Sequence, residues 1–153
     1  RHVHWHQALF HLALGQKAAA LALHDTRVWA APSEDVRDLM NAASLLWRLE
    51  SHGVAVGARR WQELADIAEQ RSGDHAWAFA DLHHVLCLAA AGRREALAEM
   101  LLGIVGHAAG RGGDVARVAG ECGHISHAAV EVVGADGVAD SIGLLDHGFV
   151  VWL

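Results

Sequence analysis

Apolar residues recur with helical periodicity along most of the chain, and glycine or polar breaks separate the periodic segments. Only residues 149–153 resemble the alternating pattern of a half-buried strand. The pattern therefore predicts an all-α protein. Its expected helices cover residues 2–14, 18–28, 34–51, 58–71, 74–91, 94–109, 115–133 and 138–147, with a loop at residues 110–114.

The glycines that separate paired helices recur at a regular interval. Gly15, Gly53, Gly92 and Gly134 are 38, 39 and 42 positions apart, which is in the range of helical repeat arrays. The spacing predicts about four helical hairpins in an α-α superhelix, a tetratricopeptide-like solenoid, over residues 1–147. Residues 148–153 stay unassigned, and an irregular helical bundle is the alternative architecture.

Small residues and caps support this organisation. Ala8, Gly15, Ala20 and Pro32 match the tetratricopeptide template, in which small side chains let two helices approach closely and a proline closes the hairpin. Ser33 is the expected N-cap of the third helix. Asp74 and Asp114 are expected to cap later helices.

The sequence resembles the family named after tetratricopeptide repeat protein 38. The first hairpin carries the resemblance in residues 5–9, Gly15, residues 20–21 and Asp25, and later matches include residues 48–49, 53–57, 60–61, 74–75, 79, 81, 83, 113–114, 116–117, 123 and 136–139. His24 departs from it, because an aromatic residue is usual there. The resemblance implies a helical repeat fold, a binding role and no established catalytic activity. It also implies an internal portion, truncated at both ends, of a longer protein.

Composition narrows the partners and the compartment. The net charge of -6 gives no basic field for nucleic acid or for an anionic membrane, and the apolar run at residues 85–91 is too short to span a bilayer. Cys87 and Cys122 lie in apolar runs and are expected to be reduced core residues. The sequence thus predicts a cytoplasmic protein, and the use of arginine over lysine suggests a bacterial source.

Histidines supply the candidate site. His2 and His6 lie four apart on one helix face, a spacing used by zinc ligands, but without the glutamate of a zinc hydrolase motif. His6, Ser44 and His83 each lie nine residues before a turn glycine, so they are expected to form a polar column in a concave groove. The predicted groove residues are His2, Trp5, His6, Leu9, Ser44, Leu82 and His83.

A single metal ion cannot join this column. Helices pack about 8 to 10 Å apart, so His6 and His83 are expected to stand roughly 16 to 20 Å apart, beyond the reach of one ion. The sequence predicts no cofactor and assigns no metal ligand set, although local pairs such as His2 with His6, or Asp81 with His84, stay open. The alternative polar site comprises His6, His75, Asp81 and His83.

Other polar and aromatic residues favour structural roles. The six tryptophans are expected to fill the core. Asp81 lies mid-helix among apolar residues and is expected to pair with His84, Arg48 or a neighbouring helix. No nucleophile elbow or P-loop is present.

The favoured function is therefore a non-catalytic scaffold that binds a protein or peptide in its groove. The alternative is a metal-binding protein or a hydrolase-like enzyme that uses the polar site. Self-association through exposed repeat ends is also expected.

Overall fold

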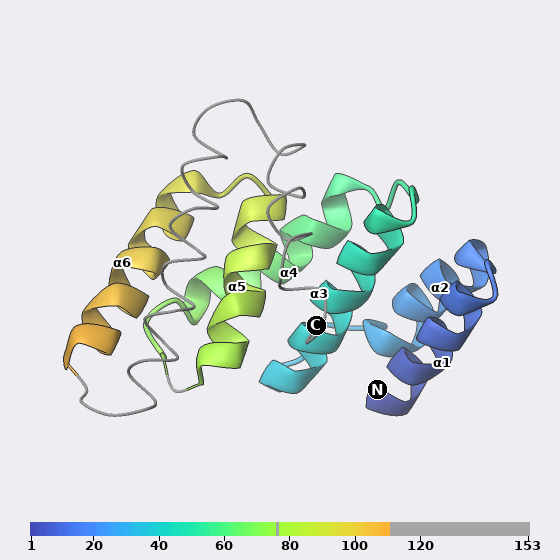
Figure 1. Ribbon diagram of the computed structural model, residues 1–153, viewed down its shortest axis with the longest axis horizontal. Coiled ribbons are helices and arrows are strands. Elements are labelled where there is room, and N and C mark those ends of the chain that lie inside the picture. The colour runs from blue at the N-terminus through green and yellow to red at the C-terminus, as the bar shows by residue number, and fades with distance from the viewer. Residues whose placement is uncertain (76, 111–153) are drawn as a thin grey trace. The chain divides into compact units, whose positions relative to one another are not determined.

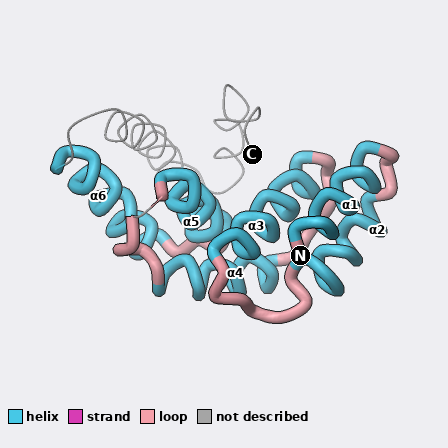
Figure 2. Tube along the Cα trace, turned by 90° about the horizontal axis from the view of Figure 1, so that it is seen from below, coloured by secondary structure: helices cyan, strands magenta, loops and turns pink. Residues whose placement is uncertain are grey.

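The computed structural model describes residues 1–75 and 77–110, except for the side chains of residues 108–110, and these residues are helical or loop (Figure 1, Figure 2). The helices are α1 (His2–Ala13), α2 (Lys17–Leu23), the π-helix η1 (His24–Val28), α3 (Val36–Ser51), α4 (Ala58–Gln70), α5 (Ala78–Ala90) and α6 (Arg94–Gly110). The all-α prediction is confirmed over the described residues. The expected helices at residues 115–133 and 138–147, the Gly134 turn, Cys122 and the tail lie outside them.

The chain divides into two compact units, of which the first is Arg1–Ile67 and the second begins at Ala68. In the first unit, α1 and α2 form a closely packed hairpin, and α3 packs against both helices. Ala8 and Ala20 are fully buried, as expected for small residues that let two helices approach closely.

The turns that follow α1, α3 and α5 are closed by the same type of hydrogen bond. Gly15 has a φ of +74°, a conformation that glycine adopts without steric cost. The N–H of Gln16 donates to the carbonyl of His11 at 2.8 Å, which is the long hydrogen bond of a Schellman motif. At Gly53 and Gly92 the N–H of the following residue likewise reaches a carbonyl five positions back, at 2.9 Å. These three glycines therefore end helices as the sequence predicted.

Helix α3 is the centre of the first unit, because every residue from 39 to 47 is buried. Its N-cap is Asp35, whose side chain accepts a hydrogen bond from the backbone N–H of Arg37 at 3.0 Å. The prediction of Ser33 as the cap is wrong. The Ser33 hydroxyl donates instead to the Asp38 carboxylate at 2.7 Å, while the Asp35 carboxylate serves as the cap acceptor.

The second helix changes type before it ends. Its predicted extent to Val28 is right, but residues 24–28 form a π-helix, in which the N–H of Trp29 donates to the carbonyl of His24 at 2.7 Å. The wider turn brings positions four and five residues apart to one side. His24, Val28 and Trp29 are accordingly all buried.

The second unit is built on the α5–α6 hairpin. Its core includes Ala80, Val85, Cys87, Leu88, Leu97, Met100, Leu101 and Ile104. Helix α5 begins four residues later than predicted, and Asp74 does not cap it. His75 has a φ of +38° and Trp77 is extended, so the backbone becomes helical only at Ala78.

The tryptophans differ in burial. Trp29, Trp47 and Trp61 are buried core residues as predicted, whereas Trp77 is half-exposed, contrary to the prediction. Cys87 is free and buried, as expected. Among the described residues, no helix is both long and apolar enough to cross a bilayer.

Candidate functional site

Three aromatic rings of α1 pack together on one face of the helix. The His2 ring stacks on the Trp5 indole with centroids 5.5 Å apart. The His6 ring meets His2 edge-on at 4.5 Å and Trp5 at 4.8 Å. Residues three and four apart on a helix share a face, so the local sequence alone brings these rings together.

Side chains of α3 fix the three rings in place. The Trp5 indole Nε1 donates to the Ser44 hydroxyl at 2.9 Å, and His2 Nδ1 lies 3.1 Å from Asn41 Oδ1. The Arg48 guanidinium lies over the Trp5 ring, 5.6 Å from its centroid, and donates to the Ser44 carbonyl at 3.1 Å. We call these six residues, His2, Trp5, His6, Asn41, Ser44 and Arg48, the α1–α3 cluster.

Two of the α3 residues that contact the three rings are themselves buried. Asn41 and Ser44 are buried, and burial lowers the pKa of the half-buried Arg48 from its usual value. The guanidinium nevertheless stays charged at neutral pH, since arginine loses its proton only in strong base. The α1–α3 cluster therefore presents a fixed indole and a cation at one surface.

The structure brings together four of the seven predicted groove residues, namely His2, Trp5, His6 and Ser44. Leu9 is half-buried on the same helix. Leu82 and His83 belong to α5 in the second unit. Sequence reasoning did not include Asn41 and Arg48, although they lie three and four residues from Ser44 and so share its helix face.

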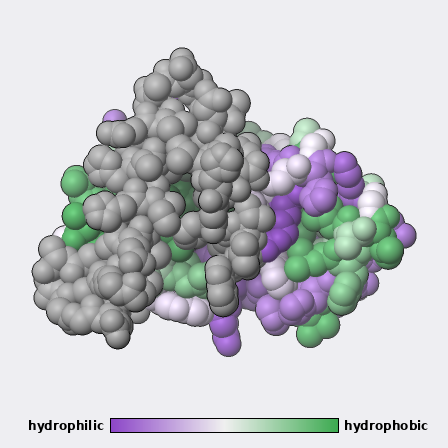
Figure 3. Space-filling model, in the orientation of Figure 1, coloured by the Kyte–Doolittle hydropathy of each residue, from purple (hydrophilic) through white to green (hydrophobic). Residues whose placement is uncertain are grey.

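An apolar surface adjoins the cluster on α1. The exposed large side chains there are Val3, Phe10 and Leu14, at 75%, 70% and 73% exposure. Figure 3 shows hydrophobic surface at the α1–α2 end of the first unit, next to hydrophilic surface over α3. Apolar side chains this exposed are typical of a contact surface.

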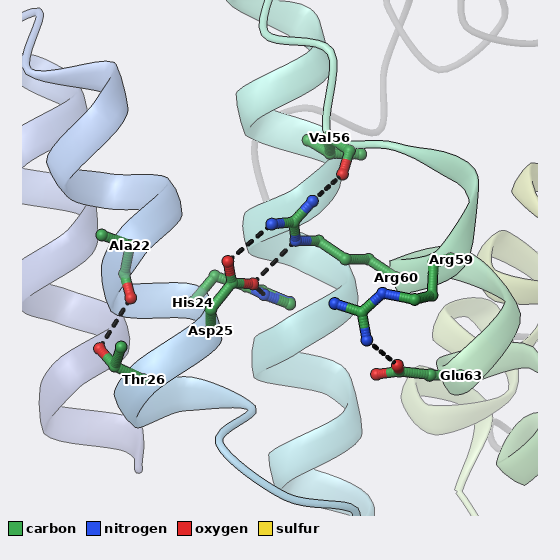
Figure 4. Close-up of polar contacts among 8 residues, drawn as sticks. All are labelled: Ala22, His24, Asp25, Thr26, Val56, Arg59, Arg60 and Glu63. Atoms are coloured by element: carbon green, nitrogen blue, oxygen red, sulfur yellow. Dashed lines mark hydrogen bonds and ion pairs between the residues drawn. The ribbon is translucent and has the colours of Figure 1, made fainter.

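A second cluster of polar residues lies between η1 and α4. Figure 4 shows Arg60 of α4 extending toward Asp25, and the guanidinium donates to both carboxylate oxygens, at 2.8 and 2.6 Å. Arg60 also donates to the Val56 carbonyl. The hydrogen bonds from Arg60 lower the pKa of Asp25 to about 2.

His24 lies beside this ion pair. Its Nδ1 is 3.1 Å from Asp25 Oδ1, and its buried Nε2 has no hydrogen-bond partner among the described residues. Burial lowers the pKa of His24, so the ring is neutral at physiological pH. The adjacent pocket has a volume of about 500 Å³ and is lined by His24, Asp25, Trp29, Ala30, Ala31, Pro32, Arg59, Arg60 and Glu63.

The charges around this pocket cancel in pairs. Arg60 pairs with Asp25, and Arg59 pairs with Glu63 at 2.5 Å. The pocket is therefore a neutral recess with no excess charge for a charged ligand. Sequence reasoning noted Asp25 and His24 only in connection with the family resemblance, because Asp25 and its partner are 35 positions apart.

In the alternative polar site, two of the four residues meet. His75 Nδ1 lies 3.4 Å from Asp81 Oδ2. The expected pairing of Asp81 with His84 is thus wrong, because the turn before α5 places His75 beside the carboxylate. Arg48, the other expected partner, belongs to the first unit. His6 contacts His2 in the first unit, and His83 Nδ1 donates to the Phe79 carbonyl at 2.8 Å.

The surroundings of His75 favour a packing role. A Cβ atom at Gly103 of α6 would lie 2.3 Å from His75 Nε2, so the far side of the imidazole faces the α6 backbone. Burial raises the pKa of Asp81, and the neighbouring His75 opposes that shift. The pair thus ties the turn before α5 to the hairpin core.

His84 is a buried histidine on α5. Both of its ring nitrogens are buried without a hydrogen-bond partner among the described residues, and burial lowers its pKa to about 4. In the described part of the chain, no three His, Cys, Asp or Glu side chains gather as a metal site.

No protein-family model matches this sequence, and no solved structure matches the chain.

Proposed function

We propose that this chain is a non-catalytic helical repeat module of the tetratricopeptide-like kind, related to the family of tetratricopeptide repeat protein 38, that binds a peptide or protein segment. The packing of the first unit supports this. Helix α1 contacts its hairpin partner α2 and also α3, the next α-helix along the chain. Neighbouring repeats in such arrays stack through these helices, and their first helices line the binding surface.

The observation that carries the proposal is the contact between Trp5 and Ser44, with Arg48 over the indole. Tryptophan and arginine are enriched among the residues that dominate binding energy at interfaces. The indole is only partly buried, so part of the ring stays accessible. Since Trp5 is already held by a hydrogen bond and by Arg48, little side-chain entropy is lost when a partner binds.

The charge of the cluster favours an acidic partner. Arg48 is positive, and none of the six residues is a carboxylate. Opposite charge steers association and favours the correct partner. The expected ligand is a segment that carries aspartate or glutamate beside an apolar side chain.

Selection from random linear peptides displayed on phage, in buffer containing EDTA, tests the proposal. The expected result is enrichment of acidic peptides, whose affinity, measured by fluorescence polarisation, falls about tenfold in Trp5→Ala, equivalent to about 1.4 kcal/mol. His6→Ala changes an exposed residue of the same face and should also weaken binding. Gln7→Ala, on a different face of α1, is the matched control.

The proposal fails if no peptide is enriched, or if the enriched peptides bind Trp5→Ala and His6→Ala as tightly as the parent chain. Circular dichroism of each variant shows whether it retains the helical content of the parent.

Self-association is a second part of the proposal. The exposed apolar side chains of α1 and its C-terminal turn, Val3, Phe10 and Leu14, are the expected contact between two copies. Sedimentation velocity should show concentration-dependent association that Phe10→Glu reduces, while a parent chain that stays monomeric at all concentrations contradicts it.

A further inference from the structure

Two imidazole nitrogens meet at the exposed edge of the α1–α3 cluster. His2 Nε2 and His6 Nε2 are 3.1 Å apart, one helical turn from each other on α1. Both residues are exposed, so the two nitrogens lie within reach of solvent species. Helical spacing alone predicts a shared face, but the structure adds that the same nitrogen of each ring points to one position.

Asn41 selects the tautomer of the first ring. His2 Nδ1 is 3.1 Å from the Asn41 side-chain oxygen, which can only accept, so Nδ1 carries the proton. His2 Nε2 therefore keeps its lone pair. A hydrogen bond to the second ring nitrogen is the usual way in which proteins orient a metal-binding histidine. In the metal-free state, His6 Nε2 donates its proton to His2 Nε2.

We propose that His2 and His6 form a two-histidine site for a borderline divalent transition-metal ion such as Zn²⁺. Zinc lies about 2.1 Å from a histidine nitrogen. Two such ligands at angles between square and tetrahedral stand about 3.0 to 3.4 Å apart, which includes the observed separation. When the ion binds, it replaces the hydrogen bond between the rings, and the proton of His6 moves to its Nδ1.

The remaining coordination positions are open. No group of three potential ligands forms among the residues that the structure describes, so water or a carboxylate from a bound molecule completes the shell. The ion is thus exchangeable, unlike the closed four-ligand ion of a structural zinc site. The preference follows from the ligands, because imidazole suits zinc, nickel and copper, whereas magnesium and calcium prefer oxygen.

This inference does not rest on the proposed function. The peptide selection described above contains EDTA and reports on Trp5, so it can fail while the metal site stands, and the reverse also holds. If both hold, a carboxylate of the acidic segment is a suitable further ligand for the ion.

Long-range ¹H–¹⁵N NMR spectra of the full chain, with its α-amino group acetylated so that it cannot bind metal, test the site. On titration with zinc chloride at neutral pH, the Nε2 signals of His2 and His6 are expected to shift together and to saturate at one equivalent for the pair. Because protons compete with the ion for imidazole nitrogens, a titration at pH 5 should need more zinc.

Other histidines of the same hairpin provide the controls. His4 and His11 are bonded to Gln7 and Gln16, and neither has a histidine four positions away on α1. The expected result is that His6→Ala abolishes the zinc-induced shift of His2, whereas His4→Ala leaves it unchanged. An unchanged His2 shift in His6→Ala, an equal response to magnesium, or no shift at excess zinc overturns the proposal.

Discussion

Arg60 donates two parallel hydrogen bonds to the Asp25 carboxylate, from Nε to Oδ1 at 2.8 Å and from Nη2 to Oδ2 at 2.6 Å. This geometry is the strong, two-point form of an arginine–carboxylate pair. It connects η1 to α4 within the first unit, across 35 positions of sequence. Its strength can be measured through the ionisation of Asp25.

We expect Asp25→Asn to lower the free energy of unfolding at pH 7 by about 1 kcal/mol. The pKa of Asp25 falls from 3.8 to about 2 in the folded chain, a shift equivalent to at most about 2.4 kcal/mol. The side chain is more than one-third exposed, so solvent screening reduces the effect. Because the folded pKa is lowered, this stability is present above pH 3.8 and is lost as the pH falls toward 2.

Urea denaturation at pH 7 and at pH 2.5 measures this difference. Glu63→Gln is the matched control, because Glu63 pairs with Arg59 at the rim of the same pocket and a surface pair four residues apart is worth about 0.5 kcal/mol or less. Equal losses in the two variants, or a loss that does not change with pH, would argue against the predicted role of Arg60.

His84 should make the second unit sensitive to mild acid. Its folded pKa is about 4, below the ordinary value of 6.5, so the folded state disfavours the charged ring. The corresponding stability is present above pH 6.5 and is lost as the pH falls toward 4, by about 3 kcal/mol in all. NMR titration of His84 checks the pKa directly, and a value near 6.5 contradicts the prediction.

Replacement of His84 by leucine removes this sensitivity. His84→Leu deletes two buried nitrogens that lack partners among the described residues, so it should raise the free energy of unfolding at pH 7 by about 1 kcal/mol. Between pH 7 and pH 4.5 the variant should lose less stability than the parent. His4→Ala, at a half-buried histidine of α1 whose ring bonds to Gln7, should retain the acid sensitivity of the parent.

Two glycines of α6 provide a paired test of the packing around His75. A Cβ at Gly103 would lie 2.3 Å from His75 Nε2, whereas a Cβ at Gly106 would meet nothing within 4 Å. Gly106→Ala should stabilise the chain by about 1 kcal/mol through helix propensity. Gly103→Ala gains the same propensity but displaces His75, so it should be about 1 to 3 kcal/mol less stable than Gly106→Ala.

The double variant His75→Ala/Gly103→Ala decides whether the clash is the cause. In the His75→Ala background, the two glycine substitutions should have similar effects on the urea midpoint. If Gly103→Ala still lowers the urea midpoint more than Gly106→Ala does when the imidazole is absent, the loss of stability arises elsewhere in α6.

The hydrogen bond from Trp5 to Ser44 should be measurable as a coupling energy. Ser44→Ala leaves the Trp5 Nε1 without its acceptor and should cost about 1 kcal/mol. A double-mutant cycle with Trp5→Phe should return most of that cost as coupling. Ser51→Ala, on the same helix, removes only a bond to the Trp47 carbonyl and should show no coupling to Trp5.

Helix positions were largely predictable from the sequence, because the breaks are made by residues with strong local preferences. Gly15, Gly53 and Gly92 adopt positive φ, and their ability to do so follows from glycine itself. The start of α5 was not predictable in this way. Aspartate is a common N-cap residue, so Asp74 was expected to cap α5. The positive φ of His75 is not helical, however, and α5 begins only at Ala78.

Most of the predictable part of the candidate site shares one helix, and Ser44 was added from another helix through its spacing to a turn glycine. Helical spacing alone places His2, Trp5 and His6 on one face. The bond from His2 to Asn41 and the ion pair of Arg60 with Asp25 join separate helices, and no local pattern encodes which residues of two packed helices meet. A histidine that ends an apolar alanine and leucine run, as His24 does, was the one available signal for the pocket.

The π-helix at residues 24–28 has a consequence for the length of the chain. Its closing bond joins Trp29 to His24, five positions apart, where an α-helix would join residues four apart. The π-helical turn therefore contains one residue more than the α-helical turn that would replace it. Deleting a single residue there can be absorbed by converting the turn to α-helix, at the expense of the orientation of Asp25. Two chains of this fold can thus differ in length by one residue at this point while the helices on either side stay in register.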